Sequence, residues 1–162
     1  MATEKKGIRK RVEVAEAVPM YSNAKTSSVL KVVKRPENHL TLMEKLALVE
    51  KGISKESLES LKAIAGLDYE QLAQVLNVAR ATLINKKSPD KFNTDLSDKI
   101  MSLADIFSYG FEVFEDHDHF RKWLQSPLRA LGGKKPFDLL HSSFGREEVR
   151  NLIGRIEHGV YS

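Results

Sequence analysis

The sequence predicts an all-α fold. Apolar residues recur at the spacing of one helical face, most clearly in a segment near the end that carries Val149, Leu152, Ile153 and Ile156. Residues that cap helices precede such stripes, and glycine often follows them. The alternation of Val, Ile and aromatic residues that marks strands is nearly absent after residue 40. We therefore expect helices packed on helices from residue 41 onward.

Residues 1–40 are predicted to form a basic, partly disordered N-terminal arm. They hold nine Lys or Arg against four Asp or Glu, with a cluster at Lys5, Lys6, Arg9, Lys10 and Arg11. The arm either stays disordered or contacts the minor groove or backbone of a nucleic acid, because flexible cations gain affinity by releasing counterions. Within the arm, one apolar run predicts a short extended segment that ends at Pro36: Val29, Leu30, Val32 and Val33.

Three helices are predicted next, capped by Thr41, Ser54 and Asp68. Gly52 ends the first and Gly66 ends the second. Each carries an apolar stripe that we expect to be buried. The three stripes are Leu42, Leu46 and Val49, then Leu58, Leu61, Ile64 and Ala65, then Leu72, Ala73 and Leu76.

Residues 71–87 have the spacing of a helix-turn-helix. Ala73 is the small residue that lets two helices cross closely, and Asn77 occupies the turn position that needs a positive φ. Val78 and Leu83 are expected to hold the second helix against the first, until Ser88-Pro89 ends it. Ala79 stands where a serine N-cap is common, and losing a cap costs about 1 kcal/mol.

The exposed side of that second helix is the candidate DNA-binding surface, made of Arg80, Thr82, Asn85, Lys86 and Lys87. Arg80 or Asn85 suits a bidentate contact with guanine or adenine, and the others suit phosphates. Residues 80–91 are net basic and residues 92–120 are net acidic, which favours a phosphate-binding side and a side turned away from it. The alternative is an ordinary helical hairpin with a solvated basic face.

Asn93 or Thr94 starts a long helix of about six turns with a core-facing stripe. Gly110, near its end, costs about 1 kcal/mol relative to alanine. Asp116 or Asp118 caps the next helix, which carries Phe120, Trp123 and Leu124 inside. The aromatic stripe is expected to be core rather than a cofactor site: Phe107, Phe111, Phe114, Phe120 and Trp123.

A turn at Leu131-Gly132-Gly133 and a short helix from Pro136 to Leu140 lead into the last helix. Ser142 or Ser143 caps that helix, and Gly159 is a left-handed stop. An aromatic on the short tail Val160-Tyr161-Ser162 would suit a plug for a pocket of a partner. A frayed end is the alternative.

Several classes of function lack support in the sequence. Cysteine is absent, which removes disulfides and thiolate chemistry and fits a cytoplasmic protein. No apolar run is long enough to span a bilayer, and no signal peptide follows the basic N-terminus. Asp116 to His119 is the only acid–histidine cluster, and because adjacent side chains diverge we expect a helix start there rather than a metal site. We expect a binding protein without catalytic residues, metal or cofactor.

The C-terminal sequence resembles the toxin-binding domain of Xre/MbcA/ParS antitoxins. The resemblance covers roughly residues 60–162 and rests on pieces that follow the family's order: Trp123-Leu124, Pro127, Leu131-Gly132-Gly133, Pro136-Phe137-Asp138-Leu139-Leu140, Gly145 and Gly159-Val160. Phe137 and His141-Ser142 depart from the usual residues, which bears on the toxin that is bound. The resemblance implies an Xre-like helix-turn-helix region at 41–91, after the arm, and a toxin-binding domain at 92–162.

The resemblance also implies a function. The chain is expected to be a type II antitoxin that occludes the active site of a cognate RES-domain toxin, an NAD-degrading enzyme, and represses its own operon as a transcription repressor. Expected partners are that toxin, operator DNA with an inverted repeat, a second copy in a homodimer, and a higher toxin–antitoxin assembly, with no membrane. The expected toxin-binding residues are Lys134, Lys135, Arg150, Arg155, His158, Gly159, Val160, Tyr161 and Ser162.

Two rival functions fit the same sequence. One is a stand-alone helix-turn-helix regulator whose C-terminal domain dimerises or binds a small ligand. The other is a hydrolase that uses the cluster from Asp116 to His119. If the tail does not inhibit the toxin, we expect inhibition from the turn at Leu131 to Leu140 and a helix face made of Arg146, Arg150 and Arg155.

Overall fold

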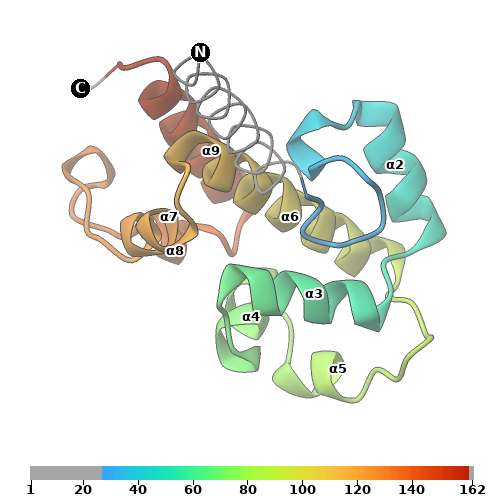
Figure 1. Cartoon of the computed structure of the whole chain (residues 1–162). Helices are drawn as coiled ribbons and strands as arrows, with labels where there is room; N and C mark the ends of the chain where they lie inside the picture. Colours follow the sequence, from blue (N-terminus) through green and yellow to red (C-terminus); the bar gives the residue numbers. More distant parts are fainter. Residues whose placement is uncertain (1–26, 161–162) are drawn as a thin grey trace, which may run out of the picture.

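The computed structural model describes residues 27–160, which contain eight α-helices and two short 3-10 helices (Figure 1). The α-helices are α2 (Leu42–Lys51), α3 (Lys55–Ala65), α4 (Tyr69–Leu76), α5 (Arg80–Ile84), α6 (Thr94–Phe114), α7 (His117–Leu124), α8 (Pro136–Leu139) and α9 (Ser143–Glu157). The 3-10 helices are η1 (Glu37–His39) and η2 (Arg129–Leu131). Within residues 27–160 the only β pairing is a bridge between Ser54 and Lys91. The predicted all-α class is confirmed.

The helix starts follow the capping residues of the sequence. Thr41 and Asp68 each form a capping box, because the side chain of the third helical residue also accepts from the backbone N–H of the cap. Ser54, Asn93, Asp116 and Ser142 accept backbone N–H groups at the starts of α3, α6, α7 and α9.

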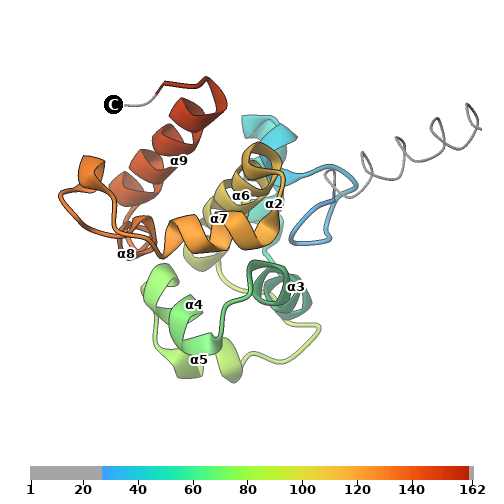
Figure 2. The ribbon, with the colours of Figure 1, turned by 60° about the vertical axis from the view of Figure 1, so that its left-hand side comes forward.

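Helix α6 is the centre of the fold. It contacts α2, α3 and α4 on the helix-turn-helix side and α7 and α9 on the other (Figure 2). Its stripe is buried at Ile100, Leu103, Ile106 and Phe107. One continuous core therefore joins the N-terminal and C-terminal helices.

The predicted extended segment at residues 29–33 is wrong, because these residues form a bent loop. The buried carboxylate of Glu37 accepts the hydroxyl of Ser28 at 2.6 Å and the backbone N–H groups of Val29 at 3.0 Å and Leu30 at 2.9 Å. Those N–H groups are therefore used locally and cannot form a strand ladder. The loop packs into the core through Val29 and Leu30, so residues 27–40 of the predicted arm belong to the folded part. The basic cluster Lys5 to Arg11 lies outside the described residues.

The predicted burial of the α2 stripe is only partly correct. Val49 is buried, but the exposed fraction of Leu42 is 71% and that of Leu46 is 41%. The neighbouring Met43 is also 71% exposed. Periodicity identifies an apolar face of a helix but does not show which part of it meets the core. Helix α2 turns its C-terminal half toward α6 and leaves the apolar side of its first turns in solvent.

Two glycines mark places where helices pack too closely for a side chain. A Cβ on Gly110 of α6 would lie 2.1 Å from Cζ of Phe120 on α7. A Cβ on Gly145 of α9 would lie 1.8 Å from the backbone oxygen of Leu139 on α8. Gly110 was expected to be only a soft spot in the long helix. The structure corrects this, since its missing side chain makes room for the ring of Phe120.

Candidate functional site

The helix-turn-helix has the predicted turn. Helix α4 ends at Asn77, which adopts the left-handed conformation with φ 51° and ψ 53°, and the N–H of Val78 donates to the oxygen of Ala73 at 3.0 Å. Ala73 and Leu83 are buried, and Val78 packs against the core. Helix α5 is thereby held against α4 as the sequence predicts.

Helix α5 is shorter than predicted, because it ends at Ile84 rather than at Ser88-Pro89. Ala79 makes no side-chain cap, and the chain turns at Lys87, whose oxygen accepts from the N–H of Asp90 at 2.7 Å. The following residues return along the start of α3, where the N–H of Phe92 donates to the oxygen of Ile53 at 2.8 Å. Lys86 and Lys87 therefore belong to a loop after α5 and not to the helix.

We call the five predicted DNA-binding residues the reading face: Arg80, Thr82, Asn85, Lys86 and Lys87. Arg80, Thr82, Asn85 and Lys87 are exposed. Lys86 is half-buried, with Nζ 5.6 Å from the ring centre of Phe92. Lys55 of α3 steadies the end of α5 by donating to the oxygen of Leu83 at 2.5 Å. The reading face thus consists of one short helix and the loop after it, and the hydrogen bond from Lys55 of α3 holds that helix in place.

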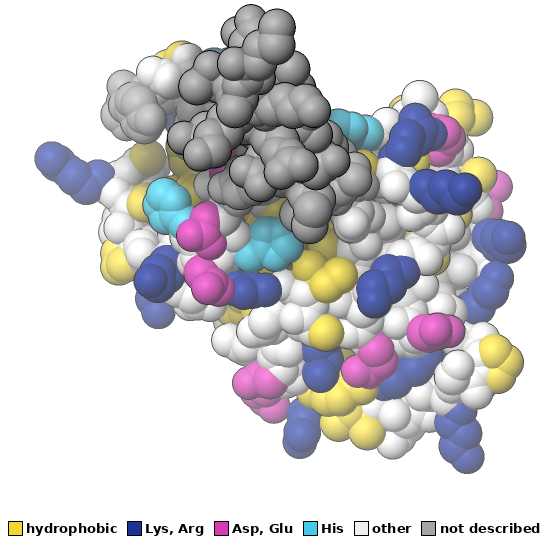
Figure 3. Space-filling view, viewed as in Figure 1, with side chains coloured by type: hydrophobic (Ala, Val, Ile, Leu, Met, Phe, Trp, Pro, Cys, Tyr) yellow, Lys and Arg dark blue, Asp and Glu magenta, His cyan; other side chains and the backbone are white. Residues whose placement is uncertain are grey.

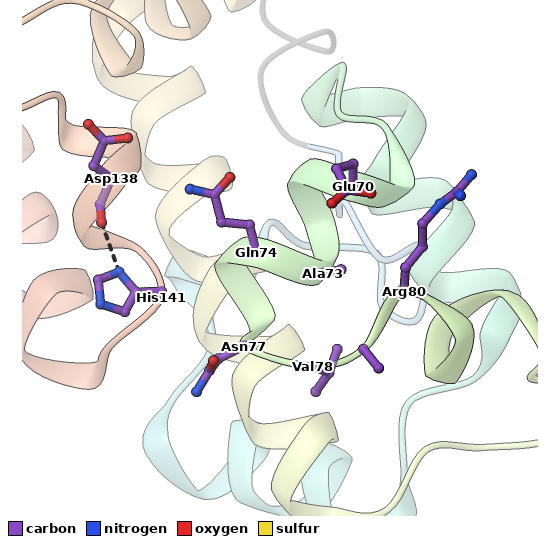
Figure 4. Close-up of a pocket in the computed structure, with 9 residues that line it drawn as sticks. Glu70, Ala73, Gln74, Asn77, Val78, Arg80, Asp138 and His141 are labelled. Carbon is purple, nitrogen blue, oxygen red and sulfur yellow. Dashed lines mark hydrogen bonds between the residues drawn. The ribbon is translucent and has the colours of Figure 1, made fainter.

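A polar groove of about 920 Å³ lies between the helix-turn-helix and α8 (Figure 4). Its lining includes Gln74 and Asn77 on one side and Asp138 and His141 on the other, where Nδ1 of His141 lies 2.8 Å from the oxygen of Asp138. Arg80 also lines this groove, together with the carboxylates of Glu70 and Asp138.

A second groove, of about 560 Å³, lies in the C-terminal part, and we call it the apolar groove. Helices α6 and α7, the segment of η2 and the end of α9 line it through Phe114, His119, Trp123, Leu128, Arg129, Ala130, Leu152, Arg155, Ile156 and Val160. Phe114 and Trp123 were expected in the core, but both are only half-buried and present their rings to this groove. Most of its lining is apolar, with Arg129 and Arg155 as its cations.

The arginines of α9 do not form the single face that the sequence suggested. Arg146 is buried and donates to Oγ of Ser102 and to the oxygen of Leu140, both at 3.0 Å. Burial lowers the pKa of the Arg146 guanidinium below its ordinary value. Arg150 donates to Oδ2 of Asp105 at 2.5 Å and lies over the ring of Tyr109. Arg155 alone of the three lines the apolar groove.

The remaining predicted toxin-binding residues are spread over the same end of the molecule. Lys134 is exposed and Lys135 is half-buried, on the loop that leads into α8. His158 ends α9, and Gly159 has φ +68°, which confirms the predicted left-handed stop. The N–H of Val160 then donates to the oxygen of Arg155 at 2.8 Å, and its side chain reaches the apolar groove. Tyr161 and Ser162 lie outside the described residues.

The side chains from Asp116 to His119 serve separate local contacts. Asp116 caps α7, as one of the predicted alternatives had it, and Asp118 pairs with Arg121 at 2.7 Å. His117 stacks on Phe111 at 3.8 Å between ring centres, and His119 meets the edge of Phe114. Residues 27–160 contain no group of three His, Asp or Glu side chains arranged to hold a metal ion.

The fold and its surfaces define a class: a helix-turn-helix protein joined by one long helix to a helical binding domain. Comparison with known families agrees with both parts. Residues 44–105 match the antitoxin Xre-like helix-turn-helix domain, and residues 110–159 match the antitoxin Xre/MbcA/ParS C-terminal toxin-binding domain.

Three named relatives are similar to this chain, two of them over most of its length. An Antitoxin Xre of Yersinia enterocolitica is 24% identical over 85% of this chain and 93% of its own length. A protein named Prs ADP-ribosylating antitoxin, from a Sphingobium strain, is 25% identical over 74% of this chain and 82% of its own. An Antitoxin Xre of Photorhabdus laumondii is 37% identical over 44% of this chain and 49% of its own.

The chain belongs to the Xre/MbcA/ParS antitoxins, and it is a type II antitoxin with a helix-turn-helix and a C-terminal domain that binds a cognate toxin. This family acts by binding rather than by catalysis. No helix among residues 27–160 is long and apolar enough to cross a membrane.

Proposed function

We propose that this antitoxin neutralises a RES-domain, NAD-degrading toxin by occluding its active site. The apolar groove would hold the toxin while Val160, Tyr161 and Ser162 enter the pocket for NAD. The observation that carries the proposal is the position of Val160, whose side chain lines the groove while 56% of it stays exposed. The Sphingobium relative bears ADP-ribosylating in its name, and ADP-ribosylation is chemistry of NAD.

The groove has the composition of the centre of a protein interface. Trp123, Leu152 and Ile156 offer apolar area, and aromatic anchors carry much of the binding energy at such centres. Arg129 and Arg155 add donors for acidic groups of a partner. Among residues 27–160, the one carboxylate paired with Arg155 is that of Glu148, at 3.9 Å, and such a long contact leaves the guanidinium available to the toxin.

The test compares NAD turnover by the toxin with full-length antitoxin and with a chain that lacks Val160–Ser162, at equal measured occupancy of the toxin. We expect the truncated chain to bind but to leave NAD turnover largely intact, with an unchanged melting temperature. Equal inhibition by both chains would refute the plug and leave inhibition to the groove.

A charge reversal separates the groove from the tail. Arg155→Glu should weaken toxin binding by roughly tenfold or more, because it places an acid where the toxin is expected to be acidic. Lys122→Glu is the matched control, since Lys122 is exposed on α7 next to Trp123 and does not line the groove. Equal affinities of the two variants would show that the groove is not the toxin-binding surface.

We further propose that a homodimer binds an inverted repeat before its own operon through the reading face and so represses transcription. Helix-turn-helix proteins commonly place two reading helices in successive major grooves. Arg80→Ala should cost about 1–3 kcal/mol on the operator and relax its specificity. Lys87→Ala should weaken all DNA sequences alike and reduce the salt dependence. Gel shifts that are unchanged by both substitutions would exclude the reading face.

A further inference from the structure

We propose that a second copy of this chain packs on the exposed apolar face of α2, which we call the α2 face: Leu42, Met43, Leu46 and Ala47. The inference rests on the homodimer of the proposed function and assigns the surface that forms it.

The α2 face is a contiguous patch and not a set of isolated side chains. Leu42 and Met43 are each 71% exposed and Leu46 is 41% exposed, and these residues lie on successive turns of one helix. Hydrophobic side chains are visible at the upper right of Figure 3, where Figure 1 places α2. Val49, the third residue of the predicted apolar stripe, follows Leu46 by one turn and is buried against the core. Apolar side chains grouped in this way on a surface mark a site of contact.

The charged residues that flank the α2 face limit what can cover it. Glu44 caps its own helix by accepting the N–H of Thr41 at 2.7 Å, and it also pairs with Arg35. Lys45 reaches Oδ1 of Asp105 at 2.7 Å. Both ionisable side chains between residues 42 and 47 are thus satisfied within the molecule. The exposed Glu50 follows Leu46 by one turn and borders the patch. A nucleic acid would be repelled by that carboxylate, whereas the four uncharged side chains suit another apolar surface.

The α2 face is complementary to itself. An antiparallel pair of α2 helices, with a two-fold axis between positions 44 and 45, places Leu42 opposite Ala47 of the second copy and Met43 opposite Leu46 of the second copy. A large side chain then meets a small one at each end, and two Met–Leu pairs fill the middle. Such an isologous contact closes with two copies and leaves no open edge.

The position of α2 leaves the other surfaces free. Figure 1 shows α2 on the side of the molecule away from α7, which lines the apolar groove. The reading face on α5 is also separate from α2. Two copies joined through α2 could therefore bind DNA and toxin at the same time.

The test measures the mass of the full-length antitoxin in solution by sedimentation at a series of concentrations. Wild type should be a dimer, and Leu46→Glu should raise its dissociation constant by roughly 30-fold or more, because the charge is introduced twice at the centre of the contact. Phe144→Glu is the control. Phe144 is 84% exposed on α9, so its loss should leave both the dimer and the fold unchanged.

The absence of native cysteine allows a direct test of the register. Met43→Cys and Leu46→Cys chains, mixed and oxidised, should form a covalent dimer that contains one of each. Phe144→Cys should not cross-link. The Leu46→Glu chain should also lose affinity for the operator while it inhibits the toxin as wild type does.

Each other outcome overturns a distinct claim. A wild-type monomer at tens of micromolar would overturn the proposed homodimer and this interface together. A dimer that persists in Leu46→Glu would overturn the α2 face alone. If the thiol of the Met43→Cys chain became reactive only after removal of residues 1–26, and the mass did not change, the N-terminal arm would be the occupant and the proposal would be wrong.

Discussion

Gly110→Ala is expected to destabilise the antitoxin, although alanine favours helices. The new Cβ would lie 2.1, 2.3 and 2.5 Å from three ring atoms of Phe120. Nonbonded carbon atoms need about 3.5 Å, so the ring would have to retreat by more than about 1 Å. Phe120 is fully buried, with Phe107 and Phe111 each 5.6 Å away and Trp123 at 5.9 Å between ring centres. It cannot retreat without moving that cluster.

The magnitude follows from two opposing terms. Alanine gains about 1 kcal/mol over glycine inside a helix. Overpacking a rigid core costs about 1–3 kcal/mol and occasionally more, and contact with three ring atoms lies at the upper end of that range. The net loss is about 2 kcal/mol, which corresponds to a melting temperature lower by roughly 4–8 °C for a chain of this size.

Gly154→Ala on α9 is the matched control. Its Cβ would lie 3.4 Å from the hydroxyl of Tyr109, which is ordinary contact, so the helix preference of alanine should raise the melting temperature by about 2–3 °C. Scanning calorimetry of the two variants at one pH decides the matter. If both variants were stabilised equally, the close packing of α6 on α7 would be refuted.

Three further predictions concern residues of α6, α7 and α9. Ile153→Ala should cost about 2–5 kcal/mol in urea unfolding, and Leu152→Ala should fall at the low end, because Ile153 is fully buried whereas Leu152 borders the apolar groove. Burial, and then the charge of Arg121, lowers the pKa of His117; its contribution to stability is therefore present above about pH 6.5 and is lost as the pH falls through the folded pKa. The melting temperature should drop between about pH 7 and pH 5, and His117→Phe should flatten that part of the curve. Asp105→Asn should cost roughly 2 kcal/mol, less at high salt, since Lys45 and Arg150 would then face a neutral amide; an unchanged urea midpoint would contradict this.

Local signals in the sequence were sufficient for most of the helix boundaries. Thr41, Asp68 and Ser142 cap the helices that follow them, because a capping side chain bonds to backbone two or three residues away. Asn77 predicted the turn for another local reason, because asparagine tolerates the left-handed backbone conformation that the turn needs. The end of α5 was missed because a return of the chain along α3, far away in the sequence, stops that helix before Ser88.

The candidate surfaces depended on contacts between distant residues and were harder to predict. Nothing near Arg146 in the sequence shows that it meets Ser102, and nothing near Leu42 shows that α6 leaves it uncovered. The apolar groove was missed because Phe114 and Trp123 carry the same pattern as core aromatics. The rings of these two residues are partly exposed because a groove separates them from the end of α9.

The arginines of α9 show that one side of the helix binds the rest of the fold and the other side faces the apolar groove. Arg146 and Arg150 occupy the side that faces α6 and the end of α8, where Ser102, Asp105 and Leu140 accept their hydrogen bonds. On the same side, Tyr109 donates to Oε2 of Glu157 at 2.5 Å, and burial followed by this carboxylate raises the pKa of Tyr109 to about 12. Tyr109 therefore stays protonated and fixes the last turn of α9 to α6. With that turn held, Arg155 and Val160 are presented together at the apolar groove, so the polar contacts on one side of the helix position the binding surface on the other.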